Sequence, residues 1–206
     1  MIIGINATGS AIQYGYFSEH GSQIITLNQT KQVERLPDLV IGMIDSVSFQ
    51  PSKVVSLTGP GSYTGIRIGL TVAKMLGKIY QIPVMGCSLF DAFMIAQSSF
   101  IHELTVLTSN SRKGFVNLQL FQSNDGSYQS ISSILQLNYQ QLSNFLAKFD
   151  QPVSWVHLND PIPSDVSFPI QCLSMDFPIQ QLLSNIPSNE GHDFSDLSLI
   201  YSSTVF

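Results

Sequence analysis

The chain has 206 residues, of which 44% are hydrophobic and only 11% are charged, enough apolar material for one large domain or two lobes with a buried core. Its net charge of −5 and its nine scattered Lys and Arg residues exclude a protein that grips nucleic acid through a broad basic face. Two distant cysteines without a CxxC motif do not indicate a disulfide framework. Without a signal peptide or a membrane-length apolar run, we expect a cytoplasmic protein.

The first half of the chain has the pattern of an α/β fold. Apolar runs separated by turn residues predict a meander of three strands at residues 2–6, 11–17 and 23–27. Apolar side chains then recur every three or four residues, which predicts helices at 31–47, 66–81 and 88–98. Two short apolar runs between these helices predict strands at 53–58 and 83–86. Because a helix joins these two strands, they should be parallel.

The second half is less regular. Its apolar runs predict a hairpin of strands 104–108 and 115–121, a helix at 138–149, a strand at 153–158 and a helix at 178–186. A strong turn signal lies at 124–126, a proline-rich loop at 161–169 and a polar stretch at 188–196. We place a lobe boundary near 98–104, which divides the chain into lobes of residues 1–100 and 101–206.

The most informative segment is the glycine-rich turn Gly-Pro-Gly-Ser-Tyr-Thr-Gly at 59–65, between a predicted strand and a predicted helix. It is not a Walker A loop, because Ile and Arg follow its last glycine, and its spacing does not match a dinucleotide-binding fingerprint. We favour a structural role for Gly59, Gly61 and Gly65, either positive φ or close approach of helix and strand. Ser62 is better explained as a helix cap than as a nucleophile, because no base accompanies it.

Extended to residue 77, this segment reads GPGSYTGIRIGLTVAKMLG and resembles the signature of the TsaB family of tRNA threonylcarbamoyladenosine biosynthesis proteins. The family core is Gly-Pro-Gly-Ser-Phe-Thr-Gly-Leu-Arg-Ile-Gly, from which only Tyr63 and Ile66 differ. Further blocks resemble the family in the same order, at 33–37, 82–89, 110–116 and 197–201. The resemblance is strong over residues 1–121 and faint beyond them.

The resemblance implies a two-lobed, actin-like (ASKHA) α/β fold. One lobe would be a ribonuclease-H-like βββαβα unit, and the second a smaller or degenerate α/β lobe. The strand and helix pattern of the first half agrees independently with such a lobe.

Departures from related enzymes argue against autonomous catalysis. ATP-using members of the superfamily carry an aspartate at the end of the first strand, where this chain has Asn6, and an amide lacks the charge of a magnesium ligand. The family's Asp-Ala-Arg has become Asn110-Ser111-Arg112. The catalytic relative TsaD carries a His-x-x-x-His metal motif, but no such spacing occurs among His20, His102, His157 and His192. We therefore expect no catalytic residues, no metal and no cofactor of the chain's own.

By resemblance, the chain would be a non-catalytic partner of a TsaD homologue, with the ATPase TsaE in the same assembly. It would meet tRNA only through the complex; a homodimer when alone and adenine nucleotide at a subunit junction both stay open. The family interface uses the first two helices, so we expect it at 31–47 and 66–81. Their candidate interface residues are Leu36, Leu39, Val40, Met43, Arg67, Thr71, Lys74 and Met75. Three alternatives stay open: a diverged homologue without this partnership, a stand-alone metal- or ATP-dependent enzyme, and a peptidase-like enzyme.

Overall fold

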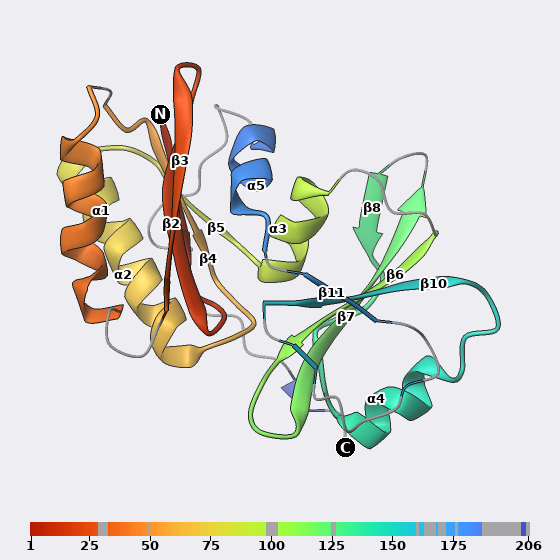
Figure 1. The fold of residues 1–206 in the computed structure, drawn as a ribbon. Coiled ribbons are helices and arrows are strands. Elements are labelled where there is room, and N and C mark those ends of the chain that lie inside the picture. Colours follow the sequence, from red (N-terminus) through yellow and green to blue (C-terminus); the bar gives the residue numbers. More distant parts are fainter. Residues whose placement is uncertain are drawn as a thin grey trace. The chain divides into compact units, whose positions relative to one another are not determined.

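The computed structural model describes residues 1–28, 33–48, 50–97, 103–124, 127–159, 161–162, 168, 172–175, 177–186 and 203–204. The chain divides into two compact units, both drawn in Figure 1. Unit 1 comprises Met1–Ala96 and Pro178–Ile200, and unit 2 comprises Gln97–Phe177 and Tyr201–Phe206.

Unit 1 is built on a five-stranded sheet of order β3-β2-β1-β4-β5. Its strands are β1 (Ile2–Asn6), β2 (Ala11–Ser18), β3 (Gly21–Asn28), β4 (Lys53–Leu57) and β5 (Val84–Cys87). The first three strands form an antiparallel meander, as the sequence predicts. β4 pairs parallel with β1, and β5 pairs parallel with β4. A helix joins β4 to β5, the connection that parallel strands require.

Helices cover both faces of this sheet (Figure 1). The helical segments of unit 1 are η2 (Val33–Arg35), α1 (Leu36–Asp45), α2 (Tyr63–Tyr80), α3 (Leu89–Ala96) and α5 (Ile179–Asn185). α1 and α2 pack on one face, where Ile3 and Ile5 of β1 join their core. α3 and α5 lie on the other face, where Leu183 of α5 packs directly over Gly4. A larger residue at position 4 would require the Leu183 side chain to shift.

Unit 2 has a sheet of order β11-β10-β6-β7-β9-β12, with β8 paired to β7. Its elements are β6 (Leu104–Asn110), β7 (Phe115–Asn124), β8 (Ser127–Ser130), β9 (Leu135–Asn138), α4 (Tyr139–Leu146), β10 (Val153–Leu158), β11 (Cys172–Met175) and β12 (Ser203–Thr204). Leu142 and Leu146 of α4 pack with Val106, Leu118 and Trp155 in its core. An Asn138–Gln141 capping box begins α4.

Unit 2 repeats the topology of unit 1. Its strands β9-β7-β6-β10-β11 follow the order β3-β2-β1-β4-β5 of the first sheet. In both, three antiparallel strands are followed by a helix and then by a strand parallel to the first. Two ribonuclease-H-like sheets in one chain are the actin-like arrangement, so the predicted fold class is confirmed.

Several predicted boundaries differ from the structure. The helix predicted at 66–81 begins at Tyr63, because Ser62 caps it. The helix predicted at 31–47 is a 3-10 turn followed by α1, with residues 31–32 outside the described residues. β8, β9, β11 and β12 were not predicted, and most of the loop at 161–169 and all of 188–196 lie outside the described residues. The prediction that residues 101–206 form one lobe is wrong for α5, because its apolar face completes the unit 1 core.

Candidate functional site

The glycine-rich turn is packed tightly against the end of β1. Gly59 and Gly61 have φ angles of 104° and 153°, a region that favours glycine. A Cβ on Gly61 would collide with the Thr8 carbonyl oxygen, and one on Gly65 would collide with that of Ala7. Gly61 and Gly65 therefore allow the turn and the start of α2 to pack closely against residues 7 and 8.

The hydrogen-bonding groups of this turn are used within the unit. The Ser62 N–H donates to the Thr8 carbonyl (2.7 Å), and the Gly59 carbonyl accepts from the Leu89 N–H (2.7 Å). The Ser62 hydroxyl accepts from the Gly65 N–H (3.3 Å), which places this oxygen as a helix cap. A phosphate loop needs N–H groups pointing at its ligand, and here the Ser62 and Gly65 N–H groups bond to the protein.

Asn6 is enclosed in a neutral network at the end of β1. It is 1% exposed, and its Nδ2 donates to Gln13 Oε1 (3.0 Å). Its Oδ1 accepts from the Thr8 N–H (3.1 Å) and hydroxyl (2.7 Å). The amide thus stabilises the turn after β1.

The histidines do not come together in the described structure. His20 is exposed in the β2–β3 turn, and His157 is buried in unit 2. The hydroxyl of Thr108 lies 2.8 Å from His157 Nδ1 and accepts from Trp155 Nε1 (2.9 Å), which places this histidine in a core network. His102 and His192 lie outside the described residues. Among the described residues, no group of three or more His, Cys, Asp or Glu residues could hold a metal ion.

Neither cysteine is set up as a nucleophile. Burial, with the nearby Asp91 carboxylate, raises the pKa of the Cys87 thiol to about 12. Burial likewise raises the pKa of Cys172 to about 11, against a lowering hydrogen bond from the His157 backbone. Both thiols are therefore protonated at neutral pH, and the thiolate is the reactive form.

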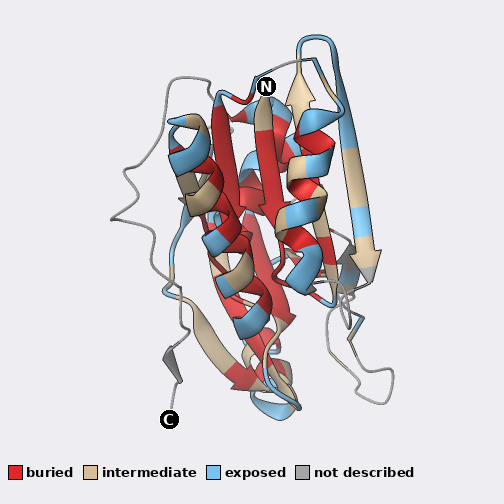
Figure 2. Cartoon of the chain, turned by 90° about the vertical axis from the view of Figure 1, so that its left-hand side faces the viewer, coloured by how far each residue is buried: buried red, intermediate tan, exposed pale blue. Residues whose placement is uncertain are grey.

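The two helices predicted to form an interface, α1 and α2, bury much of their surface within unit 1 (Figure 2). Leu36 and Val40 are fully buried and Met43 is 5% exposed, all in the core formed with the sheet. These three side chains are therefore covered by the core of unit 1 and are not exposed on the outer surface of α1. Leu39, Lys74 and Met75 are partly buried, and Arg67 and Thr71 are exposed.

The outward surface of these helices contains a groove of about 470 Å³. It is lined by Glu34, Pro37, Tyr63, Thr64, Arg67, Ile68, Thr71 and Val72. Tyr63 is 52% exposed, a large value for an aromatic side chain. The Arg67 guanidinium lies 5.3 Å from the Tyr63 ring centroid and donates to its hydroxyl (3.3 Å). We call this surface the α1–α2 groove; it combines an aromatic anchor, a cation and apolar walls.

Sequence reasoning found Arg67 and Thr71 of the groove but missed Tyr63 and Glu34. In the sequence Tyr63 is only a variant of the family's phenylalanine, since its position at the first turn of α2 depends on where the helix begins. Ile79, further along α2 and outside the groove, is an apolar side chain that is 58% exposed. This exposure was not predicted from the sequence. Its exposure could have been inferred from its place two turns after the exposed Thr71.

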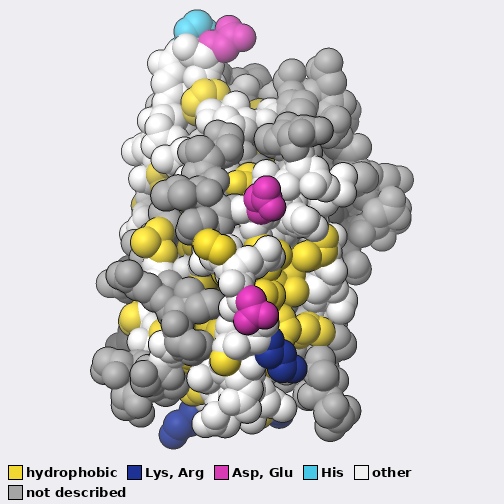
Figure 3. All heavy atoms as spheres, turned by 90° about the vertical axis from the view of Figure 1, so that its right-hand side faces the viewer, with side chains coloured by type: hydrophobic (Ala, Val, Ile, Leu, Met, Phe, Trp, Pro, Cys, Tyr) yellow, Lys and Arg dark blue, Asp and Glu magenta, His cyan; other side chains and the backbone are white. Residues whose placement is uncertain are grey.

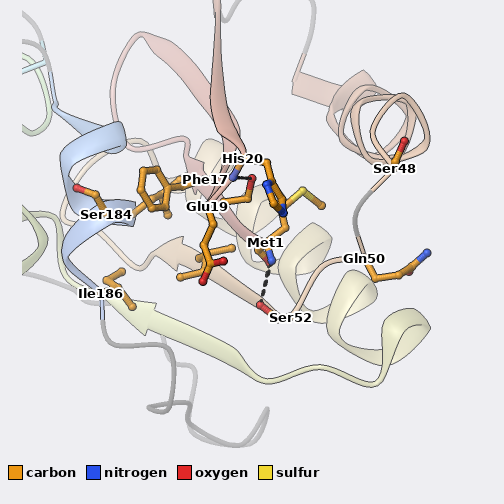
Figure 4. Close-up of a pocket in the computed structure, with 12 residues that line it drawn as sticks. Met1, Phe17, Glu19, His20, Ser48, Gln50, Ser52, Ser184 and Ile186 are labelled. Carbon is orange, nitrogen blue, oxygen red and sulfur yellow. Dashed lines mark hydrogen bonds between the residues drawn. The ribbon is translucent and has the colours of Figure 1, made fainter.

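A second cavity, of about 580 Å³, lies at the opposite end of β1 from Asn6 (Figure 4). Phe17 and Ile186 line it with apolar surface, and Glu19 and Ser52 with polar surface. The Met1 amino group donates to Ser52 Oγ (3.4 Å). None of the residues predicted for the interface or the glycine-rich turn lines this cavity.

The surface carries few charges. On the face shown in Figure 3, acidic and basic side chains are sparse among the uncharged surface. Among the described helices, none is long and apolar enough to cross a membrane.

Comparison with known proteins identifies the relatives of this arrangement. Residues 26–178 match the family model of TsaD, tRNA N6-adenosine threonylcarbamoyltransferase. The chain belongs to the TsaD-like family. Proteins named TsaB and YeaZ are among those it is similar to. It is 29% identical over 133 residues to the tRNA threonylcarbamoyladenosine biosynthesis protein TsaB of Bacillus subtilis (strain 168), covering 63% of this chain and 57% of that protein.

Solved structures agree in fold. YeaZ from Pseudomonas aeruginosa superposes with a TM-score of 0.68 at 17% identity, covering 97% of this chain and 98% of that chain. A Bacteroides thetaiotaomicron protein with an actin-like ATPase fold and unknown function gives a TM-score of 0.50 at 10% identity, covering 89% and 95% of the two chains. At these identities the likeness concerns the fold alone.

Proposed function

We propose that this chain is a non-catalytic partner subunit in the synthesis of N6-threonylcarbamoyladenosine at position 37 of tRNAs that read ANN codons. It would bind a TsaD-family threonylcarbamoyltransferase through the α1–α2 groove, with TsaE in the same assembly and tRNA held mainly by other subunits. Two observations support the proposal: the family membership, and an exposed Tyr63–Arg67 pair on the helices that the family resemblance singles out.

The groove suits a protein partner better than a small substrate. Tyrosine and arginine are the side chains most enriched at energetically important interface positions. The Thr71 hydroxyl donates to the Arg67 carbonyl (2.8 Å) on the same surface. Glu34 faces the same groove and supplies a charge opposite to that of Arg67. We propose that adenine nucleotide, where the assembly binds it, lies at this subunit junction.

The test is size-exclusion chromatography with light scattering of the full chain mixed with the TsaD-family protein of the same cell, with and without ATP and TsaE. We expect the mass of a 1:1 complex. Arg67→Glu should weaken it about tenfold or more, because it removes the cation and repels the partner's acceptors. Lys148→Glu, an equal charge reversal on exposed surface of unit 2, should leave it unchanged.

A folded chain that forms no complex under any of these conditions would instead support a diverged homologue. A mass of twice the chain in the absence of partner, reduced by Arg67→Glu, would show that the free protein forms a homodimer through the same surface. Threonylcarbamoyl transfer by the chain alone would contradict the non-catalytic role.

A further inference from the structure

The turn between β6 and β7 presents two adjacent cations. Arg112 and Lys113 are both exposed, and we call them the basic tip. The turn is held by hydrogen bonds from the Ser111 N–H to the Phe115 carbonyl (3.0 Å) and from the Phe115 N–H to the Arg112 carbonyl (2.9 Å). Gly114 closes it with a φ of 79°, and nothing lies within 4 Å of where its Cβ would be. The cations therefore stand on an ordered and open turn.

Arg112 is oriented by an aromatic ring. Its guanidinium carbon lies 4.2 Å from the centroid of Phe115, the geometry of a cation–π contact. One face of the planar guanidinium is thus occupied by the ring. Guanidinium planes and aromatic rings are the surfaces on which unpaired bases stack, and the N–H groups at the guanidinium edge bind phosphate.

Among the described residues of unit 2, the acidic side chains lie away from the basic tip. Its described acids, Glu103 and Asp150, precede β6 and β10, which run parallel, so both lie at the end opposite the tip. β6 has seven residues, which at ~3.3 Å each place these acids about 23 Å from the tip. That exceeds a Debye length of ~8 Å at physiological salt. Four other acids of unit 2 lie outside the described residues, Asp125, Asp160, Asp165 and Asp176.

From this arrangement we propose that the basic tip contacts the phosphates of a single-stranded RNA segment, with the Arg112–Phe115 pair as a stacking surface. The inference rests on the proposed function, which brings an RNA loop to the assembly. Two cations can supply only a small part of the RNA-binding energy. This agrees with the net charge of −5 and with a main RNA-binding surface on another subunit. An acidic peptide would be attracted by the same charges but would make no use of the stacked ring.

The test measures fluorescence anisotropy of a labelled RNA stem-loop across a KCl titration, for the isolated full chain and for its complex. Arg112→Ala with Lys113→Ala should lower affinity at low salt about tenfold and reduce the log–log salt slope by about 1.4, since each phosphate contact to a single strand contributes ~0.7. Lys148→Ala, which removes one charge elsewhere in unit 2, should change neither. Arg112→Lys should keep the salt slope and lose affinity. Unchanged Trp155 fluorescence would show that each variant is folded.

The outcomes separate this inference from the proposed function. Tip-dependent RNA binding by the isolated chain, with no complex formed, would uphold the inference and refute the partnership. If the complex forms but its RNA affinity is unchanged by the tip variants, the partnership is upheld and the inference is refuted. The inference is also overturned if neither sample binds RNA, if Lys148→Ala matches the double variant, or if polyglutamate competes as well as unlabelled RNA.

Discussion

Replacing Gly65 by alanine should destabilise unit 1, although alanine is the better helix former. In an open helix the change would stabilise by ~1 kcal/mol. Here the added methyl group would meet the Ala7 carbonyl oxygen and lie 3.2 Å from Ser62 Oγ. Overpacking costs about 1–3 kcal/mol, and loss of the Ser62 cap costs ~1 kcal/mol. The net expectation is a loss of roughly 1–3 kcal/mol.

Gly42 provides a matched control. It lies within α1, and nothing stands within 4 Å of the place that a Cβ would occupy. Gly42→Ala should therefore stabilise unit 1 by up to ~1 kcal/mol. Native-state hydrogen exchange of peptides from β1 and α2 measures unit 1, while Trp155, the single tryptophan, reports unit 2 by fluorescence. If Gly65→Ala proves as stable as Gly42→Ala, the packing explanation of the glycine-rich turn is wrong.

Three other outcomes are expected. Thr108→Val should destabilise unit 2 by about 1–3 kcal/mol in urea unfolding, because Trp155 Nε1 and His157 Nδ1 lose their shared hydroxyl. Thr108→Ser should retain most of the stability. An equal loss of stability in both variants would contradict this network. Burial raises the pKa of Cys87 from 9.0 to about 12, so its contribution to stability is complete below pH 9 and is lost as the pH rises toward 12. Cys87→Ala should remove that part of the alkaline destabilisation, and an unchanged pH profile would contradict it. Thiol labelling at pH 8 should be slower for Cys87 than for the less buried Cys172, until urea unfolds the chain.

The first lobe was predictable because its elements carry their own patterns. Its three opening strands are bounded by turn residues, and the glycine-rich turn marks the passage from β4 to α2. Unit 2 was harder to predict from pattern. β9 contributes only four residues, half of them polar, and owes its place to pairing with β7. A local pattern cannot reveal such long-range pairing.

What covers the apolar face of α1 was not predictable for a similar reason. Apolar spacing on α1 shows that Leu36, Val40 and Met43 share a face, but not whether a sheet or a partner covers it. The structure assigns that face to the unit's own core. α5 was predicted as a helix, yet nothing in its sequence indicates that Leu183 returns to Gly4 of the first strand.

The measurement that tests the partnership most directly is hydrogen–deuterium exchange of this chain with and without its TsaD-family partner. We predict slower exchange in α1 and in the outward turns of α2 around Tyr63 and Arg67, with α4 of unit 2 unchanged. Exchange that slows only in unit 2, or nowhere at saturating partner, would contradict the assignment of the α1–α2 groove as the docking surface.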